Sequence, residues 1–248
     1  MKIAICLYGQ PRDYKNGYKC INNFIKNNSE NTYDFFFHCW IDDNIKYETS
    51  NWRKIDEKTL FIKNQNIVKN DINQLYKPID CLYEPPLDKN NEEILIHIEY
   101  IRKSKAYINS NHNTKNNIYN TFSQIYSRNK VKDLFENYIT NTKTNYDIVI
   151  STRFDCLDFP TNLKMLNIHK NKIYKLSIYK HRYIIPDNFL IIPPEIYINW
   201  FNMYKNIKNL INNDKIHLEM KHMNETLIFN MEEILLSNYL FCGYNVNN

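Results

Sequence analysis

A charged pair separated by one aromatic residue offers the most specific chemistry in this sequence. Arg153, Phe154 and Asp155 come just after the apolar run Tyr146–Ser151. In an extended segment, side chains at positions i and i+2 point the same way, so Arg153 and Asp155 share a face while Phe154 packs into the core. A carboxylate there can hold Mg²⁺ or Mn²⁺ that bridges a diphosphate, and the arginine can pair with phosphate. The alternative is a structural Arg–Asp ion pair at a strand end.

The turn after the first apolar run of the chain is a second candidate site. The run Lys2–Tyr8 favours a buried strand, and it ends in Gly9, Gln10, Pro11 and Arg12. The backbone N–H groups of such a turn and the Arg12 guanidinium can bind phosphates. A nucleotide is a ligand that such a turn can bind. A plain strand-to-helix turn is the alternative.

Polar residues also follow the second apolar run, where His38, Trp40 and Asp42 lie. Ligands of open α/β sheets bind just beyond the carboxyl ends of the strands, so these residues are candidates for the same site. A histidine in an aromatic run is, however, more often a core or rim residue with one hydrogen bond. The sequence has no HExxH-type zinc motif, and Cys156 has no obvious histidine partner in sequence that would indicate a catalytic thiol.

These candidates need a sheet that brings strand ends together. The strand–helix–strand pattern over residues 2–40 is typical of a βα unit with parallel strands. We therefore expect an α/β fold in one domain over residues 1–248, with a mainly parallel central sheet flanked by helices and a variable, insertion-like region at residues 41–110. The expected helices cover residues 14–26, 92–107, 121–138, 195–210 and 224–238, and the further expected strands cover residues 146–151, 172–178, 183–192 and 241–246.

Composition excludes several protein classes. Of the 248 residues, 32 are Lys or Arg and 27 are Asp or Glu, and the net charge of +5 is too small for a histone-like protein. The hydrophobic content of 43% excludes intrinsic disorder, and the presence of only 3 glycines argues against Gly-rich nucleotide loops. No run of about 18 apolar residues occurs, so we expect no membrane span. The six cysteines form no CxxC pair, so we expect a soluble, cytoplasmic protein with reduced thiols.

Taken together, these segments resemble a family of small GT-A-like glycosyltransferases found in bacterial polysaccharide loci and in large DNA viruses. The resemblance keeps the order of the family's motifs and poorly covers residues 41–110. It is carried by residues 2–18 (KIAICLYGQPRDYKNGY), 33–42 (YDFFFHCWID), 122–134 (FSQIYSRNKVKDL), 146–159 (YDIVISTRFDCLDF), 186–204 (PDNFLIIPPEIYINWFNMY) and 232–236 (EEILL). The family usually has a small residue where this chain has Tyr8, and Asp155 stands here in place of a full DxD motif.

The resemblance implies transfer of a sugar from a nucleotide-sugar donor to a hydroxyl of a glycan or glycoprotein acceptor. A divalent metal, Mn²⁺ or Mg²⁺, on Asp155 would neutralise the diphosphate together with Arg153 and Arg12. The resemblance also implies that Gln10 and the Gly9 backbone help to seat the base or ribose of the nucleotide. Asp187 is the first candidate for the base that takes the acceptor proton, with a turn-capping role as the alternative, and Glu232 is a weaker candidate for the base.

Two other functions remain open at the level of the sequence. One is a non-catalytic domain of the same fold that binds a nucleotide or glycan. The other is a single-stranded nucleic-acid binder, which the many tyrosines and mild basicity would suit. The chain has neither an RNP-like motif nor a basic stripe, so we expect no nucleic-acid partner.

Overall fold

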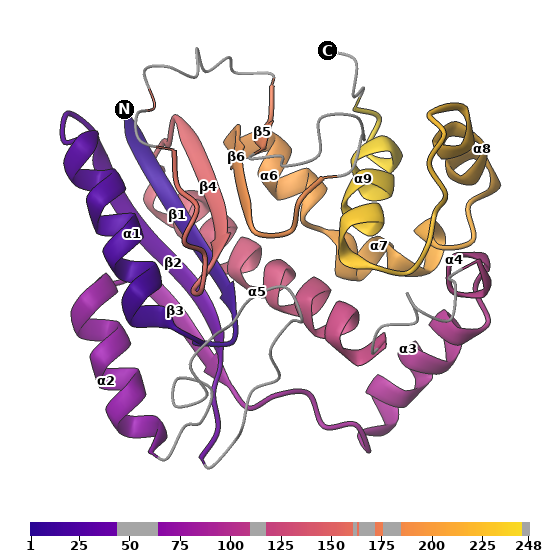
Figure 1. Cartoon of the computed structure of the whole chain (residues 1–248), viewed down its shortest axis with the longest axis horizontal. Coiled ribbons are helices and arrows are strands. Elements are labelled where there is room, and N and C mark those ends of the chain that lie inside the picture. The colour runs from indigo at the N-terminus through magenta and orange to yellow at the C-terminus, as the bar shows by residue number, and fades with distance from the viewer. Residues whose placement is uncertain (44–63, 110–117, 161–162, 164–171, 176–184, 245–248) are drawn as a thin grey trace.

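The computed structural model describes residues 1–43, 64–109, 118–160, 163, 172–175 and 185–244. They form a six-stranded sheet, in the order β3-β2-β1-β4-β6-β5, with helices on both faces (Figure 1). The strands are β1 (Lys2–Gly9), β2 (Thr32–Trp40), β3 (Asp80–Glu84), β4 (Ile148–Arg153), β5 (Tyr174–Lys175) and β6 (Phe189–Ile192). Strands β1 to β4 are parallel, whereas β6 runs antiparallel to both β4 and β5. The expected α/β class with a mainly parallel sheet is therefore confirmed.

Strand β1 lies in the middle of the sheet and is buried on both faces, which is why its sequence is an unbroken apolar run. Its side chains alternate between two hydrophobic clusters, as the period of two in a strand requires. Ile5 and Leu7 belong to the cluster on the side of α1, whereas Cys6 and Tyr8 belong to the cluster on the side of α5. Both faces of β1 are therefore closed to a ligand, which can approach this strand only at its ends.

The helices form a layer on each side of the sheet (Figure 1). Helices α1 and α2 cover one face, and the long helix α5 contacts β1, β2 and β3 on the other, where α6, α7 and α9 also pack. The bounds are α1 (Tyr14–Asn27), α2 (Gln65–Tyr76), α3 (Glu92–Arg102), α4 (Lys105–Ile108), α5 (Ile118–Thr142), α6 (Pro194–Trp200), α7 (Met203–Leu210), α8 (Asp214–His222) and α9 (Met231–Phe241). Within the described residues, none of these helices has the length and apolar character needed to span a membrane.

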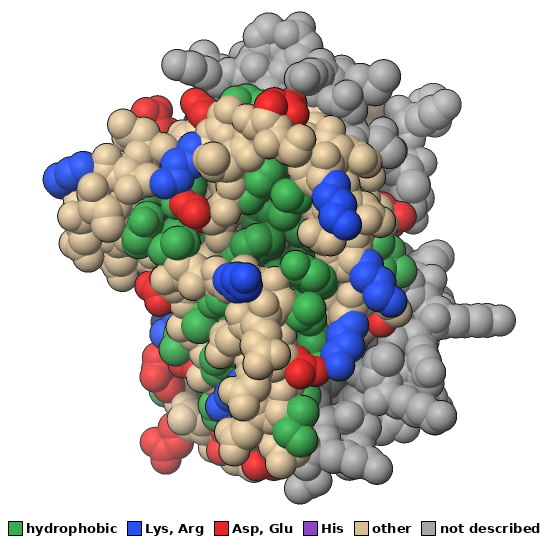
Figure 2. Space-filling view, turned by 90° about the vertical axis from the view of Figure 1, so that its left-hand side faces the viewer, with side chains coloured by type: hydrophobic (Ala, Val, Ile, Leu, Met, Phe, Trp, Pro, Cys, Tyr) green, Lys and Arg blue, Asp and Glu red, His purple; other side chains and the backbone are tan. Residues whose placement is uncertain are grey.

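The outer face of the α1 and α2 layer carries mixed charges. Figure 2 shows hydrophobic side chains along the middle of this face, with basic and acidic side chains interspersed around them. Large charged areas of one sign are therefore not a feature of this side of the molecule.

Asparagine side chains begin several of the helices. Asn64, Asn91, Asn213 and Asn230 each lie at an N-cap and accept hydrogen bonds from backbone N–H groups of the first turn. A capping side chain satisfies donors that have no partner within the helix, and replacing it with alanine costs about 1 kcal/mol. The many asparagines of this chain are thus partly used to fix where helices start.

Helix α2 and strand β3 are whole elements that the sequence pattern did not predict. Both lie in the region expected to be insertion-like, and β3 pairs in parallel with β2 from Phe36↔Asp80 to Trp40↔Glu84. All five of its residues are half-buried, because it is the edge strand and one side has no neighbour. A half-buried segment of this length has too weak an apolar pattern to be recognised without its partner strand.

The other differences concern the bounds of helices, one further helix and one expected strand. The expected helix at 195–210 is divided into α6 and α7, and that at 92–107 into α3 and α4, where the Ser104 side chain caps α4. Helix α8 was not expected, and α9 begins at Met231 rather than near residue 224. The expected strand at 241–246 is wrong where the structure describes it, because Phe241 is the last residue of α9 and a turn follows. Parts of the expected strands at 172–178 and 183–192 lie outside the described residues.

Candidate functional site

The candidate site lies where the strand order of the sheet reverses. From β1 the chain passes through α1 to β2 on one side, whereas β4 pairs with β1 on the other side. The carboxyl ends of β1 and β4 therefore form a topological switch point, the place where open α/β sheets bind ligands. Tyr8 near the end of β1 is in register with Arg153 at the end of β4. The two segments predicted to carry chemistry thus meet at this point.

The turn after β1 depends on glycine. Gly9 has a φ angle of 98°, a backbone conformation that side chains with a Cβ rarely adopt. The Gly9 N–H donates to Ser127 Oγ on α5 at 2.9 Å, which fixes the turn against the helix. Gln10 lies half-buried in the same turn, and its role in seating a nucleotide stays a prediction.

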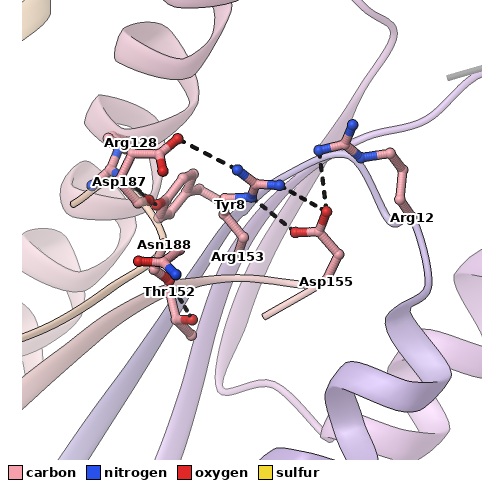
Figure 3. Close-up of polar contacts among 8 residues, drawn as sticks. All are labelled: Tyr8, Arg12, Arg128, Thr152, Arg153, Asp155, Asp187 and Asn188. Atoms are coloured by element: carbon pink, nitrogen blue, oxygen red, sulfur yellow. Dashed lines mark hydrogen bonds and ion pairs between the residues drawn. The ribbon is translucent and has the colours of Figure 1, made fainter. Parts of the chain in front are cut away.

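Asp155 is the centre of an arginine cluster (Figure 3). Both of its carboxylate oxygens accept hydrogen bonds from Arg153, from Nε and Nη2 at 2.8 Å each. Nη2 of Arg12, which follows the β1 turn, lies 3.1 Å from Asp155 Oδ2. The Asp155 side chain is only 2% exposed, whereas those of Arg12 and Arg153 are 14% and 19% exposed. One buried carboxylate therefore holds two guanidinium groups that solvent, or a ligand, still reaches.

Close packing between α1 and the end of β4 brings the two segments of the site together. Gly17 on α1 lies so near the backbone of Phe154 that a Cβ built on it would be 1.8 Å from the Phe154 carbonyl oxygen. A helix can approach a strand this closely only through a residue without a side chain. Gly17 therefore sets the distance between the helix that follows Arg12 and the segment that carries Asp155.

Asp187 borders the same cluster. Its carboxylate lies 3.4 Å from Arg153 Nη1 and is 25% exposed. Its backbone carbonyl accepts hydrogen bonds from the Tyr8 hydroxyl and from Arg128 Nη2. The neighbouring carbonyl of Asn188 accepts from Thr152 Oγ1 at 2.8 Å, so the segment is attached to β4 as well (Figure 3). The backbone of Asp187 is thus held in place while its carboxylate remains accessible.

Arg128 is a fully buried cation next to this cluster. Its guanidinium lies over the Tyr8 ring, 4.0 Å from the ring centroid, and donates to the Tyr8 hydroxyl. Its Nε and Nη1 have no hydrogen-bond partner among the described residues. Burial lowers the pKa of Arg128, and the nearby Tyr8 and Asp187 oppose this change. An arginine stays protonated in a protein interior, so Arg128 adds positive charge behind the site.

The balance of charge at the switch point is positive. Burial alone would lower the pKa of Arg153, but the carboxylates of Asp155 and Asp187 raise it above its ordinary value. The cluster contains three arginines, Arg12, Arg128 and Arg153, against these two carboxylates. The arrangement is therefore suited to an anionic group such as a phosphate, which guanidinium groups bind through paired N–H donors.

The arrangement does not fit Asp155 as a metal ligand. A divalent cation needs carboxylate oxygens that are open to it, and both oxygens of Asp155 are held by guanidinium groups. Among the described residues, no three side chains of the His, Cys, Asp or Glu type gather in a way that could hold a metal ion. The binding of Mn²⁺ or Mg²⁺ to Asp155 stays a prediction.

His38 takes part in a hydrogen-bond chain rather than in the arginine cluster. Its Nδ1 lies 2.7 Å from Ser127 Oγ, and its Nε2 lies 2.7 Å from Glu84 Oε2 at the end of β3. Burial lowers the pKa of His38, and the hydrogen bond from His38 lowers the pKa of Glu84. A neutral imidazole that accepts from Ser127 and donates to an ionised Glu84 satisfies every partner. This row of hydrogen bonds links the turn after β1, through Ser127 and His38, to Glu84 at the carboxyl end of β3.

One residue that the sequence predicted to be catalytic lies on helix α9, and some residues near the site were not predicted. Glu232 is in the first turn of α9, a helix that packs on α5, α7 and α8, and its catalytic role stays a prediction. Sequence reasoning did not single out Arg128 or Glu84, and it noted Tyr8 only as a departure from the family's usual pattern. The only signal for Arg128 is a charged residue on the apolar face of the expected helix at 121–138, whereas Glu84 is placed by the unpredicted strand β3.

Fold and site define the class of the protein as an α/β protein with a mixed, mostly parallel sheet and an arginine-rich site at its switch point. Neither a comparison with protein-family models nor one with curated proteins finds a match to this chain.

Proposed function

We propose that the protein is a glycosyltransferase of the GT-A type, which transfers a sugar from a nucleoside-diphosphate sugar to a hydroxyl group of a glycan or glycoprotein. One observation carries the proposal. Arg12 and Arg153 come from the two strand ends of the switch point, and both are held, partly exposed, by one buried carboxylate. Two pre-oriented guanidinium groups at the carboxyl edge of a parallel sheet are suited to the diphosphate of such a donor.

In the proposed reaction, the bond between the sugar anomeric carbon and the diphosphate oxygen breaks, and a bond from that carbon to the acceptor oxygen forms. The leaving nucleoside diphosphate gains negative charge as the bond breaks. Arg12 and Arg153 would stabilise this charge, and because Asp155 already orients them they need no rearrangement. The proton of the acceptor hydroxyl goes to a carboxylate, for which Asp187 is the first candidate and Glu232 the second.

Asp187 is supported as the proton acceptor by its place and its accessibility. It lies beside Arg153, and therefore beside the proposed position of the leaving diphosphate, and its side chain is 25% exposed. Its backbone is fixed by Tyr8 and Arg128, so the carboxylate can be presented in a defined position. An Asp187→Asn variant is expected to bind the donor normally and to lose most of its turnover if configuration is inverted.

The cysteines support a reducing compartment such as the cytoplasm for this proposed enzyme. All six lie within the described residues and none forms a disulfide. Burial raises the pKa of Cys6 to about 12, so this thiol is protonated and unreactive at neutral pH.

A thermal-shift panel tests the proposal. Purified protein is heated with UDP-, GDP-, CMP- and dTDP-sugars, in EDTA and in Mn²⁺. A bound nucleotide at about 100 times its dissociation constant contributes about 2.7 kcal/mol to the free energy of unfolding, which raises the Tm by about 5–10 °C for a chain of this size. We expect one nucleotide class to do so in wild type and in the control Arg102→Gln, which changes an exposed arginine on α3, and not in Arg12→Gln.

Three other outcomes would separate the alternatives. A shift without release of nucleoside diphosphate in the presence of acceptors would indicate the non-catalytic binding domain. Absence of any shift would refute a donor site at the switch point. Stabilisation that requires Mn²⁺ and disappears in Asp155→Asn would restore the metal interpretation of Asp155.

A further inference from the structure

A second concave site lies at the same edge of the sheet, two strands from the arginine cluster. It is a cavity of about 600 Å³ between the carboxyl ends of β2 and β3 and the helices α3, α5 and α7. This volume is in the range of small-molecule sites, about 300–1,000 Å³. Trp40, which the sequence made a candidate for a ligand site, lines the cavity, but neither Arg12, Arg153, Asp155 nor Asp187 does. The donor proposal therefore leaves the cavity unexplained.

The wall of the cavity is aromatic. Trp40 at the end of β2 stacks on Tyr126 of α5, with ring centroids 5.4 Å apart and an interplanar angle of 28°. Tyr204 of α7 meets Tyr126 edge to face, with centroids 5.5 Å apart. Lys130 Nζ lies 5.0 Å from the centroid of the Tyr126 ring. Trp40 is only 4% exposed, so the half-buried Tyr126 and Tyr204 offer most of the ring surface, with the Lys130 ammonium group over the Tyr126 ring.

Hydrogen-bonding groups line the rest of the cavity. Glu84 is 27% exposed, and its Oε2 lies 2.7 Å from His38 Nε2, while its Oε1 accepts a longer hydrogen bond, of 3.5 Å, from the Tyr126 hydroxyl. The hydrogen bond from His38 lowers the pKa of Glu84, so its carboxylate is ionised at neutral pH. Asn129 also lines the cavity, and only 6% of this residue is exposed. Its Oδ1 has no hydrogen-bond partner among the described residues. A ligand with several hydroxyl groups would supply the donors that these oxygens accept.

The charge of the cavity distinguishes it from the switch point. Its lining includes four carboxylates, Glu84, Asp88, Glu93 and Asp133, and two ammonium groups, Lys130 and Lys205. The balance is negative, whereas that of the arginine cluster is positive. A phosphate-bearing ligand would be repelled here, while a neutral or amino-bearing sugar would not.

We propose that this cavity binds a pyranose ring of the acceptor glycan, with the aromatic wall against the ring and Glu84 accepting a hydrogen bond from one of its hydroxyl groups. That the bound sugar is an acceptor rests on the proposed transferase function. That the cavity binds a sugar does not depend on it. A pyranose has apolar C–H groups on its faces and hydroxyl groups at its edge, and the cavity combines the matching surfaces.

The position of the cavity relative to the arginine cluster fits an acceptor. On β1, Tyr8 is in register with His38 of β2 on one side and with Arg153 of β4 on the other. Neighbouring strands lie about 4.8 Å apart, so the strand ends that carry His38 and Arg153 are about 10 Å apart. Helix α5 joins the two places, because Tyr126 lines the cavity and Arg128 contacts Asp187. The strand ends that carry Trp40 and Glu84, which line the cavity, thus lie about 10–14 Å from the end that carries Arg153, at the same edge of the sheet.

The test uses Trp40 as a reporter of the cavity. The chain has three tryptophans, so protein labelled with 5-fluorotryptophan gives few ¹⁹F resonances, and a Trp40→Phe variant assigns the one from Trp40. Methyl glycosides of glucose, galactose, mannose and N-acetylglucosamine are titrated into the full chain. At least one is expected to shift the Trp40 resonance with a millimolar dissociation constant.

Matched variants identify the groups that act. Glu84→Gln keeps an oxygen for His38 but loses the charge, and it is expected to weaken sugar binding by about tenfold or more. Tyr126→Leu removes the ring and is expected to weaken binding similarly, whereas Tyr126→Phe keeps the ring and is expected to bind within about threefold of wild type. Thermal unfolding of each variant shows whether it is folded.

The outcomes separate this inference from the proposed function. If none of the glycosides shifts the Trp40 resonance, or if folded Glu84→Gln binds as well as wild type, the assignment of the cavity is wrong, even where nucleotides bind at the arginine cluster. If UDP or GDP shifts the Trp40 resonance instead, the cavity is a nucleotide site and the inference is overturned. If a glycoside binds but no nucleotide does, the inference stands and the proposed transferase function fails.

Discussion

Replacing Asp155 with asparagine removes the charge that holds Arg12 and Arg153 together, and it changes few atoms. The Asp155 carboxylate is 2% exposed, so it makes its ion pairs almost without water. Removing one partner of a buried ion pair costs about 3–5 kcal/mol, because the other partner is left without compensation. Both arginines keep some contact with solvent, at 14% and 19% exposure, so the lower end of this range applies, about 3 kcal/mol.

The loss is measured by thermal and by urea unfolding. For a chain of about this size, each kcal/mol corresponds to about 2–4 °C in Tm, so Asp155→Asn is expected to unfold about 6–12 °C below wild type. The control is Asp158→Asn, which changes an exposed aspartate three residues further along the same segment and is expected to stay within about 0.5 kcal/mol. Equal stability of the two variants would refute the view that Asp155 holds the arginines.

The same variant also tests how the donor is bound. If Asp155 only orients the two arginines, a nucleoside diphosphate should still stabilise the folded variant in EDTA, because both guanidinium groups remain. If Asp155 holds a metal ion, Mn²⁺ should raise the Tm of wild type and should have no effect on Asp155→Asn. The two interpretations therefore give opposite patterns in one titration.

Three further changes test the surroundings of the site. Gly17→Ala would put a Cβ against the Phe154 carbonyl, so we expect a loss of about 1–3 kcal/mol or more by urea unfolding, and a variant as stable as wild type would contradict the close approach. Tyr8→Phe removes a hydrogen-bond partner of the buried Arg128 and should cost about 1–3 kcal/mol, and no loss would mean that the hydroxyl contributes nothing. Burial holds the pKa of His38 below its ordinary value of 6.5, so its contribution to stability is present above pH 6.5 and is lost as the pH falls below that value. Measured as Tm against pH, the wild type should therefore lose more stability than His38→Gln between about pH 6.5 and pH 5.

Much of the candidate site could be predicted from sequence because its residues directly follow strands with clear patterns. Arg12 and Arg153 each come within a few residues of an unbroken apolar run, and in a parallel sheet such runs end at the same edge. The close relation of Arg153 to Asp155 also follows from their spacing of two, and the structure joins them by two hydrogen bonds. That Arg12 pairs with the same carboxylate could not be predicted, because it depends on how closely α1 approaches β4.

Other parts of the site lie on elements whose position no local pattern gives. Arg128 is in the middle of a helix, and its contact with Asp187 joins residues 59 positions apart. Glu84 meets His38 across the parallel pair β2 and β3, 46 positions apart, and β3 has too weak a pattern to be expected at all. The aromatic cavity is likewise assembled from two strand ends and three helices.

The sequence by itself determined the α/β class, the two central strands and the segments that carry Arg12, Arg153 and Asp155. It could do so because hydrophobic periodicity and turn residues act over a few neighbouring positions. Only the tertiary structure decided that Asp155 is saturated by arginines, that Arg128 is buried behind Tyr8, and that Glu84 lines an aromatic cavity. These features arise from packing between elements distant in the chain, where the absence of one side chain, at Gly17, sets which charged groups can meet.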